Sequence, residues 1–158
     1  MDPDVDLVVA LDDPGRDDVA ALLDTHLAFS IEVTPPGHVH AVGSEQMTVP
    51  EMIVLSARRS NQLMGIGALR ELDPGHAELK SMHTIPTARG QGVGRAIVET
   101  AFEVAEERGY RRVSLETGTY EVFAPARALY ERMGFEVCEP FGEHIASPFS
   151  ICMTMELG

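Results

Sequence analysis

The glycines at positions 90, 92 and 94 constrain this chain more than any other feature. They follow a stretch typical of a β-strand, residues 78–84, and lead into a stretch with helical periodicity, residues 91–108. Glycine lets the backbone come close to a ligand, and the first amides of a helix are unpaired and carry the positive end of the helix dipole. Strand, glycine loop and helix therefore predict an anion site for the phosphates of a cofactor, formed by Arg89, Gly90, Gln91, Gly92, Val93, Gly94 and Arg95.

Glycines at a helix start have a second explanation, which is close packing of the helix through small residues. Two common phosphate loops are excluded by the sequence. The dinucleotide fingerprint would need a third glycine where Arg95 stands, and no Gly-Lys-Ser/Thr follows as in nucleotide triphosphate loops. The pattern that fits is Arg-x-x-Gly-x-Gly, with Arg89, Gly92 and Gly94 in its defined positions.

A second block lies further along the chain: Ala126-x-x-Leu129-Tyr130-Glu131-x-x-Gly134-Phe135. The two blocks, in this order, resemble the GNAT superfamily of acetyl-CoA-dependent N-acetyltransferases over about residues 50–157. The stretches ELKSM and FAPARALYERMGF resemble those of a bacterial subgroup with poorly defined substrates. The resemblance implies an α/β GNAT fold, whose mixed, mostly antiparallel sheet is flanked by helices and splayed at the acetyl-CoA site.

Hydrophobic periodicity and turn residues also indicate an α/β chain. A length of 158 residues suits one domain, 1–158, with its own core. Residues 34–49 are predicted to form a mobile or ligand-facing loop, because Pro35-Pro36-Gly37 stops any helix. The expected strands are 7–11, 53–58, 63–72, 77–84, 112–117, 136–139 and 149–156, and the expected helices are 17–27, 91–108 and 124–133.

The charge balance excludes some partners. A formal net charge of −13 makes nucleic acid and anionic membranes unfavourable. An acidic surface attracts cationic amines, although a solvated acidic face that aids solubility explains the same charge. No stretch approaches the ~20 apolar residues of a membrane span, and the N-terminus lacks a basic segment before an apolar run. With Cys138 and Cys152 expected as reduced thiols, the prediction is a cytoplasmic protein.

The resemblance assigns catalytic roles to three side chains. Tyr130 stands at the position of the family's general acid, and a phenol with a pKa of about 10 can protonate a departing thiolate. An ordinary core aromatic is the alternative. Glu78 and Glu116 stand on the two strands where family members place a general base, and either pKa would have to be raised by burial. The alternatives are an ion pair of Glu78 with Lys80, an anchoring role for Glu116, and a water chain instead of a dedicated base.

The resemblance also implies that backbone groups of Met82, His83 and Thr84 bind the acetyl carbonyl and the pantetheine arm. The His83 side chain is a weaker candidate for the base, because a strand histidine without an evident partner is more often structural. Many family members have Asn seven residues before the catalytic Tyr, where this chain has Phe123, so an apolar contact with the pantetheine arm is expected. Ala126, which opens the second block, is assigned to the same cofactor site.

The resulting prediction is an N-acetyltransferase that moves an acetyl group from acetyl-CoA, its co-substrate, directly to a primary amine. A small-molecule acceptor is favoured, and a homodimer is compatible with the sequence. Two alternatives stay open: a non-catalytic acyl-CoA-binding or sensor domain, and an enzyme that acts on a protein N-terminus or lysine. His38 and His40 form a His-x-His pair, but two local ligands make an incomplete metal site, so no metal is expected.

Overall fold

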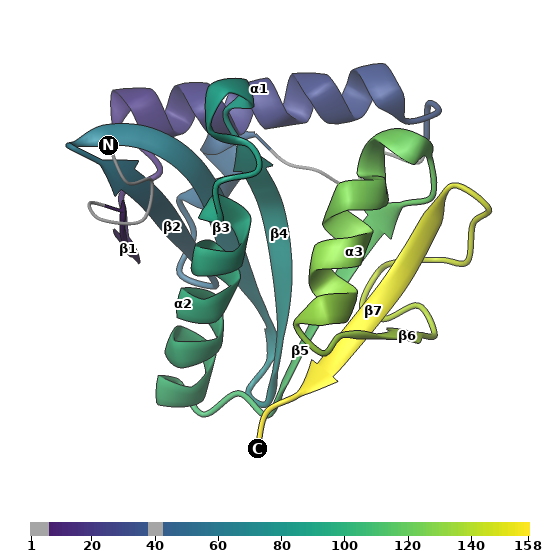
Figure 1. The fold of residues 1–158 in the computed structure, drawn as a ribbon. Helices are drawn as coiled ribbons and strands as arrows, with labels where there is room; N and C mark the ends of the chain where they lie inside the picture. The colour runs from purple at the N-terminus through teal and green to yellow at the C-terminus, as the bar shows by residue number, and fades with distance from the viewer. Residues whose placement is uncertain (1–6, 38–42) are drawn as a thin grey trace.

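The computed structural model describes residues 7–37 and 43–158. They form a seven-stranded sheet in the order β1-β2-β3-β4-β5-β7-β6 (Figure 1). β4 and β5 run parallel, and all other neighbours are antiparallel. The predicted α/β class and mixed, mostly antiparallel sheet are confirmed. The strands are β1 (Leu7–Leu11), β2 (Met52–Arg59), β3 (Gln62–Asp73), β4 (His76–Thr84), β5 (Arg112–Gly118), β6 (Glu136–Cys138) and β7 (Ser150–Glu156).

Helices cover both faces of this sheet. In Figure 1, α2 and α3 lie in front of the sheet, and α1 crosses behind its upper end. α1 buries Val19, Leu22 and Leu23 in one apolar cluster, while α2 and α3 contribute to a larger cluster on the opposite face. The described residues contain the helices α1 (Asp17–Val33), α2 (Val93–Glu107) and α3 (Ala124–Arg132), and the 3₁₀ turns η1 (Ser44–Met47), η2 (Pro86–Ala88) and η3 (Glu121–Phe123).

Two predictions about the N-terminal third were wrong in detail. α1 continues to Val33 instead of ending near Leu27, because helix-compatible residues continue until the chain turns extended at Thr34, directly before a proline. Asp17 and Asp18 lie in the first turn of α1, where their negative charge interacts favourably with the helix dipole. The predicted loop 34–49 contains the ordered turn η1, whose Met47 is buried in the core beneath α1. Residues 38–42 of that loop lie outside the described residues.

The sheet opens between its two central strands. β4 and β5 pair only from His76↔Arg112 to Leu79↔Leu115. Beyond this point β4 stays with β3 up to Thr84, whereas β5 stays with β7 up to Gly118. The predicted splay of the sheet is therefore confirmed, and it lies at the end where β4 leads into the glycine loop (Figure 1). None of the helices in the described residues has the length and apolar character needed to span a membrane.

Candidate active site

The glycine loop presents backbone amides at the start of α2. Gly90 and Gly92 adopt left-handed φ angles of 77° and 82°, a conformation that favours glycine. Gly92 is the N-cap of α2 and supplies no side-chain cap, so the first amides of the helix are not capped by a side chain. α2 accordingly begins at Val93, two residues later than predicted. An uncapped, positively polarised helix start is suited to an anion such as a pyrophosphate.

Three polar side chains of the loop bond to neighbouring groups, and none of them caps the start of α2. Gln91 Oε1 accepts a hydrogen bond of 2.8 Å from Arg59 on β2, and its Nε2 donates to Thr87 O at 3.2 Å. Arg89 Nε donates to Thr84 O at 3.4 Å. Arg95 pairs with Glu99 one turn along α2, at 2.9 Å on the surface. The bonds of Gln91 to Arg59 and Thr87, and that of Arg89 to Thr84, therefore fix the conformation of the loop.

Gly94 is needed for close packing of the helices, the second explanation given above for these glycines. A Cβ on Gly94 would lie 3.2 Å from Leu129 Cδ2, so the missing side chain lets α3 approach the first turn of α2. No Cβ contact within 4 Å limits Gly90, so its requirement for glycine comes from the backbone angle alone. The motif thus uses glycine for two physical reasons, the left-handed backbone angle at Gly90 and Gly92 and the close approach of α3 at Gly94.

A bulge in β4 distinguishes the strand segment that leads into this loop. Ser81 has a left-handed φ of 55°, and the pairing register with β3 shifts there. Past the bulge, Met82 packs toward α2, since a Cβ on Gly67 would lie 2.7 Å from both Met82 Sδ and Ile97 Cγ2. His83 points toward α1. The edge of β4 from Lys80 to Thr84 has no partner strand in β5, which leaves backbone groups for a ligand.

Tyr130 lies on α3 and is buried. It is 6% exposed, and its ring packs against Phe135 with centroids 5.7 Å apart. Burial raises the pKa of Tyr130 well above its ordinary value, so the phenol is protonated at neutral pH. Its neighbour Leu129 contacts the first turn of α2 at Gly94. Ala126, one turn earlier on α3, is partly buried against the main core.

A buried group of charged side chains lies beneath the point where β4 and β5 separate. His144, from the segment between β6 and β7, places Nε2 2.6 Å from Glu78 Oε2 and Nδ1 3.1 Å from Glu116 Oε2. Lys80 Nζ lies 3.6 Å from Glu78 Oε2, as the ion-pair alternative predicted. All four side chains are at most 9% exposed. His144 therefore bridges β4 and β5 at the point where their backbone pairing ends.

These contacts set the protonation of the group. Burial alone would raise the pKa of Glu78, but the hydrogen bond from His144 and the nearby charges of Lys80 and His144 lower it below its ordinary value. Burial would lower the pKa of His144, but its two carboxylate partners raise it to about 9. A general base role would require a raised pKa for Glu78, and the structure has the opposite. At neutral pH the group is an imidazolium between carboxylates.

We expect His144 to make the stability of the protein fall at alkaline pH. Its pKa is about 9 in the folded protein and about 6.5 when unfolded, so its contribution is complete below pH 6.5 and lost as the pH rises through 9. A difference of this size corresponds to about 3 kcal/mol. Chemical denaturation of wild type and His144→Gln between pH 6 and 10 measures it. The two stability curves should converge at high pH, and parallel curves would contradict the prediction.

Aromatic side chains gather on the α1 face at the open end of the sheet. The rings of His26 and His83 lie 5.1 Å apart, and Phe29 of α1 contacts His83 with centroids 5.9 Å apart. Phe29 also meets Phe123 at 6.1 Å. Phe123 belongs to η3, which follows β5, and a Cβ on Gly118 would overlap its ring. The contact between Phe29 and Phe123 therefore joins α1 to the segment after β5.

Sequence reasoning missed two residues of this region, His144 and His26. His144 is 66 positions from Glu78 and lies in a segment without regular secondary structure, so no local pattern indicates it. His26 lies within α1, and it contacts His83 only because α1 packs against β4. Within residues 7–37 and 43–158 no three His, Cys, Asp or Glu side chains gather as metal ligands. The His38 and His40 pair lies outside the described residues.

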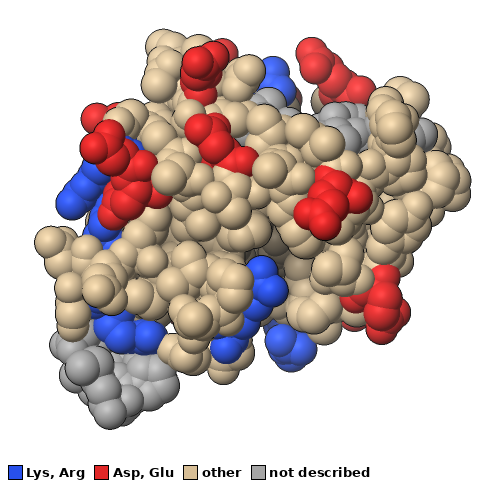
Figure 2. Space-filling model, turned by 90° about the horizontal axis from the view of Figure 1, so that it is seen from above, with Lys and Arg blue, Asp and Glu red and all other residues tan. Residues whose placement is uncertain are grey.

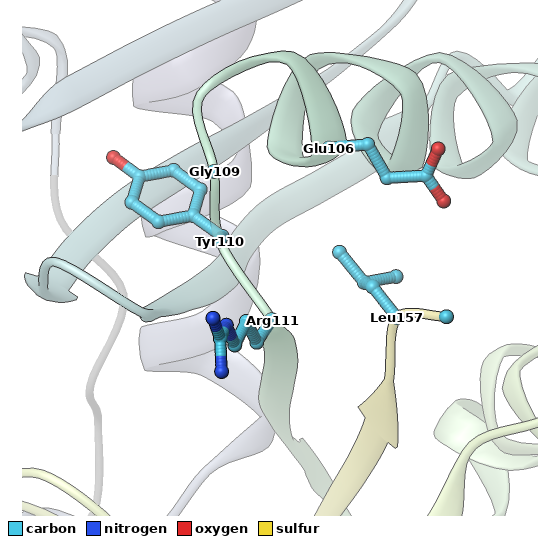
Figure 3. Close-up of a pocket in the computed structure, with 6 residues that line it drawn as sticks. Glu106, Gly109, Tyr110, Arg111 and Leu157 are labelled. Carbon is cyan, nitrogen blue, oxygen red and sulfur yellow. The ribbon is translucent and has the colours of Figure 1, made fainter.

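Two surface hollows lie away from the opening of the sheet. One, of about 520 Å³, is bordered by the end of α2, Tyr110, Arg111 and Leu157, the residue before the C-terminal Gly158 (Figure 3). The other, of about 540 Å³, borders β1 and β2 and includes Asp12 and Arg58. Figure 2 shows the molecule from above, with acidic side chains grouped at its left edge and separate elsewhere, and a few basic ones beside a hollow near the middle.

Comparison with known proteins agrees with this arrangement. The profile of the Acetyltransferase (GNAT) family matches residues 20–135. The chain is 42% identical to the uncharacterised N-acetyltransferase YsnE of Bacillus subtilis, over 94% of this chain and 99% of that protein. It is 36% identical to the uncharacterised N-acetyltransferase YedL of Escherichia coli, over 94% of both chains. A GNAT family acetyltransferase of Elizabethkingia anophelis, solved with acetyl-CoA bound, has the same fold, with a TM-score of 0.69 and 18% identity over 97% of this chain and 99% of that one. The chain belongs to the GNAT family of acetyl-CoA-dependent N-acetyltransferases.

Proposed function

We propose that this acetyltransferase moves the acetyl group directly from acetyl-CoA to the amine of a small molecule. The observation that carries the proposal is the opening between β4 and β5, which ends at the uncapped start of α2. A long thioester with a pyrophosphate fits this combination. The amides from Gly90 to Arg95 would bind the pyrophosphate, and the unpaired edge of β4 from Met82 to Thr84 would bind the arm and the acetyl carbonyl.

Tyr130 is proposed as the general acid. When the amine attacks the acetyl carbon, the carbon–sulfur bond breaks, and the departing thiolate needs a proton. A buried phenol that keeps its proton at neutral pH can donate it. A sensor that only bound acyl-CoA would have no use for a donor there, so Tyr130 favours catalysis over the non-catalytic alternative.

Glu78 and Glu116 are proposed to hold the opening in shape. Glu78 stands where the family resemblance places a base, but its carboxylate is bonded to His144 and paired with Lys80, which makes it a weak proton acceptor. Through His144 the two carboxylates join β4 to β5 at the last point before the strands separate. They therefore control the distance between the strands that the cofactor must enter.

A small acceptor is favoured over a peptide because the α1 face of the opening is covered. Phe29 and Phe123 meet across it, and His83 lies beside them. A small amine can enter a site lined by aromatic rings with its amino group first. A peptide needs an open groove on both sides of its reacting amine. The phenyl rings also imply that part of the acceptor is apolar.

Free thiol release from acetyl-CoA should increase when a small amine is added and should stay at the hydrolysis rate with peptides. The screen would compare apolar primary amines, aminoglycosides, amino acids and peptides with free N-termini or lysines. Mass spectrometry of the products would confirm the added acetyl group. Acceleration by peptides alone would move the acceptor to proteins, and cofactor binding without transfer to any amine would favour the sensor alternative.

A further inference from the structure

The pair of histidines on the α1 face is not explained by cofactor binding. His83 stands two residues past the bulge at Ser81, on the part of β4 that has separated from β5. The bulge reverses which side chains face α1, so that His83 shares the side of the sheet where Phe29 and Phe123 meet. His83 is partly exposed. Its ring is therefore next to the place where the acetyl carbon and an acceptor amine would come together.

His83 and His26 are joined by one hydrogen bond, with Nδ1 of each ring 3.0 Å apart. This bond needs one protonated and one unprotonated Nδ1. When His83 donates, its Nε2 carries a lone pair, and His26 accepts at Nδ1. If Nε2 then gains a proton, the His83 Nδ1–H bond to His26 becomes stronger because the donor is charged. His26 thus stands in the same relation to His83 as the orienting acceptor of a catalytic histidine does.

Electrostatics keeps this pair neutral and decides which ring takes a proton. Burial, followed by the charges of His83 and Lys80, lowers the pKa of His26 to about 4. Burial and the charge of Arg89 lower the pKa of His83 below its ordinary value. The charged groups that act on the rings are thus Lys80 on β4 and Arg89 after η2, both cationic. His83 is a neutral base at pH 7, and the more deeply buried His26 leaves the added proton on His83.

We propose that Nε2 of His83 accepts the proton that the acceptor amine loses, and that His26 is the residue that positions it. The proposal rests on the acetyl transfer proposed above. The amine nitrogen forms a bond to the acetyl carbon and gives its proton to His83, while the carbon–sulfur bond breaks and the thiolate takes the proton of Tyr130. His83 then releases its proton to solvent and Tyr130 regains one, so that protons balance over a turnover.

The test compares variants that keep or remove each nitrogen. His83→Asn retains an amide near the position of Nδ1 but has no Nε2. His26→Asn retains a hydrogen-bond acceptor for His83, and His26→Leu removes it. The control is His76→Asn, which removes another β4 histidine, one bonded to Ser114 away from the opening. For each variant, kcat/KM is measured from pH 5 to 9 with two acceptor amines of different pKa, and acetyl-CoA binding is measured by thermal shift.

For wild type we expect kcat/KM to fall as the pH drops below 6.5. This acidic limb should stay at the same pH when the acceptor is changed, because it reports the protonation of His83 in the enzyme and not of the amine. His83→Asn should lose this limb and ~10²–10⁴-fold in kcat/KM with acetyl-CoA binding intact. His26→Leu should shift the pH of the acidic limb and lower kcat/KM. His26→Asn should return both the position of the limb and kcat/KM close to the wild-type values, and His76→Asn should leave the limb unchanged.

The outcomes separate this proposal from the function on which it rests. If wild type transfers acetyl groups and His83→Asn keeps both the limb and the rate, His83 is structural while the function stands. Loss of the limb in Glu78→Gln or Glu116→Gln, with the limb retained in His83→Asn, would assign the base to a glutamate. If wild type binds acetyl-CoA but transfers to no amine, the proposed function itself fails, whatever the histidine variants do.

Discussion

Acetyl-CoA should stabilise the wild-type protein strongly and leave a Gly90→Asp variant unaffected. At 100 times its dissociation constant, a ligand that binds only the folded state adds ~2.7 kcal/mol. An aspartate at position 90 would bring a negative charge to the amides that are expected to bind the pyrophosphate. The same change costs the fold little beyond the backbone angle, because a Cβ at Gly90 meets nothing within 4 Å. Thermal or chemical unfolding with and without acetyl-CoA measures the difference.

Gly109→Asp is the matched control for this experiment. Gly109 lies just past the other end of α2, has a left-handed φ of 82°, and also has open space around its Cβ position. Both substitutions therefore carry the same ~1–2 kcal/mol for a left-handed residue with a side chain. Gly109→Asp should lose that amount and still respond to acetyl-CoA. An equal ligand response in both variants would place the pyrophosphate away from the glycine loop.

The second large effect is expected for Tyr130→Phe, which should lower turnover ~10²–10⁴-fold and leave acetyl-CoA binding nearly unchanged. The ring and its contact with Phe135 stay, so the packing of α3 is preserved. Only the proton donor for the departing thiolate is lost. Steady-state kinetics on a good acceptor, together with the thermal shift with acetyl-CoA, distinguish loss of chemistry from loss of binding.

Tyr110→Phe controls for the loss of a buried phenol. Tyr110 is also 6% exposed, and its hydroxyl donates to Glu71 at 3.0 Å, at the far end of α2 from the glycine loop (Figure 3). Its substitution should cost stability through that hydrogen bond and leave turnover near wild type. If Tyr130→Phe kept wild-type turnover, Tyr130 would be a core aromatic, and the thiolate would take its proton from solvent.

Local patterns determined much of this protein. Apart from the C-terminal end of α1, the alternation and periodicity of apolar residues predicted the described strands and α-helices to within a few residues, since these patterns follow from the geometry of one element facing one core. The glycine loop was predicted as the start of a helix, and Gly90 and Gly92 have the backbone angles that only glycine adopts easily. Two ordered motifs identified the family, which the relatives of the chain confirm.

Tertiary structure alone decided the electrostatics of the candidate site. The separation of β4 from β5 after Leu79 and Leu115 depends on which strand each one pairs with on its other side, and no single strand sequence contains that information. Glu78 was predicted to need a raised pKa, but a histidine 66 residues away lowers it instead. No partner of His83 is evident in the sequence, but in the fold α1 brings Nδ1 of His26 to 3.0 Å from Nδ1 of His83. A pKa depends on burial and on charges within a few ångströms, and both arise only when distant segments pack together.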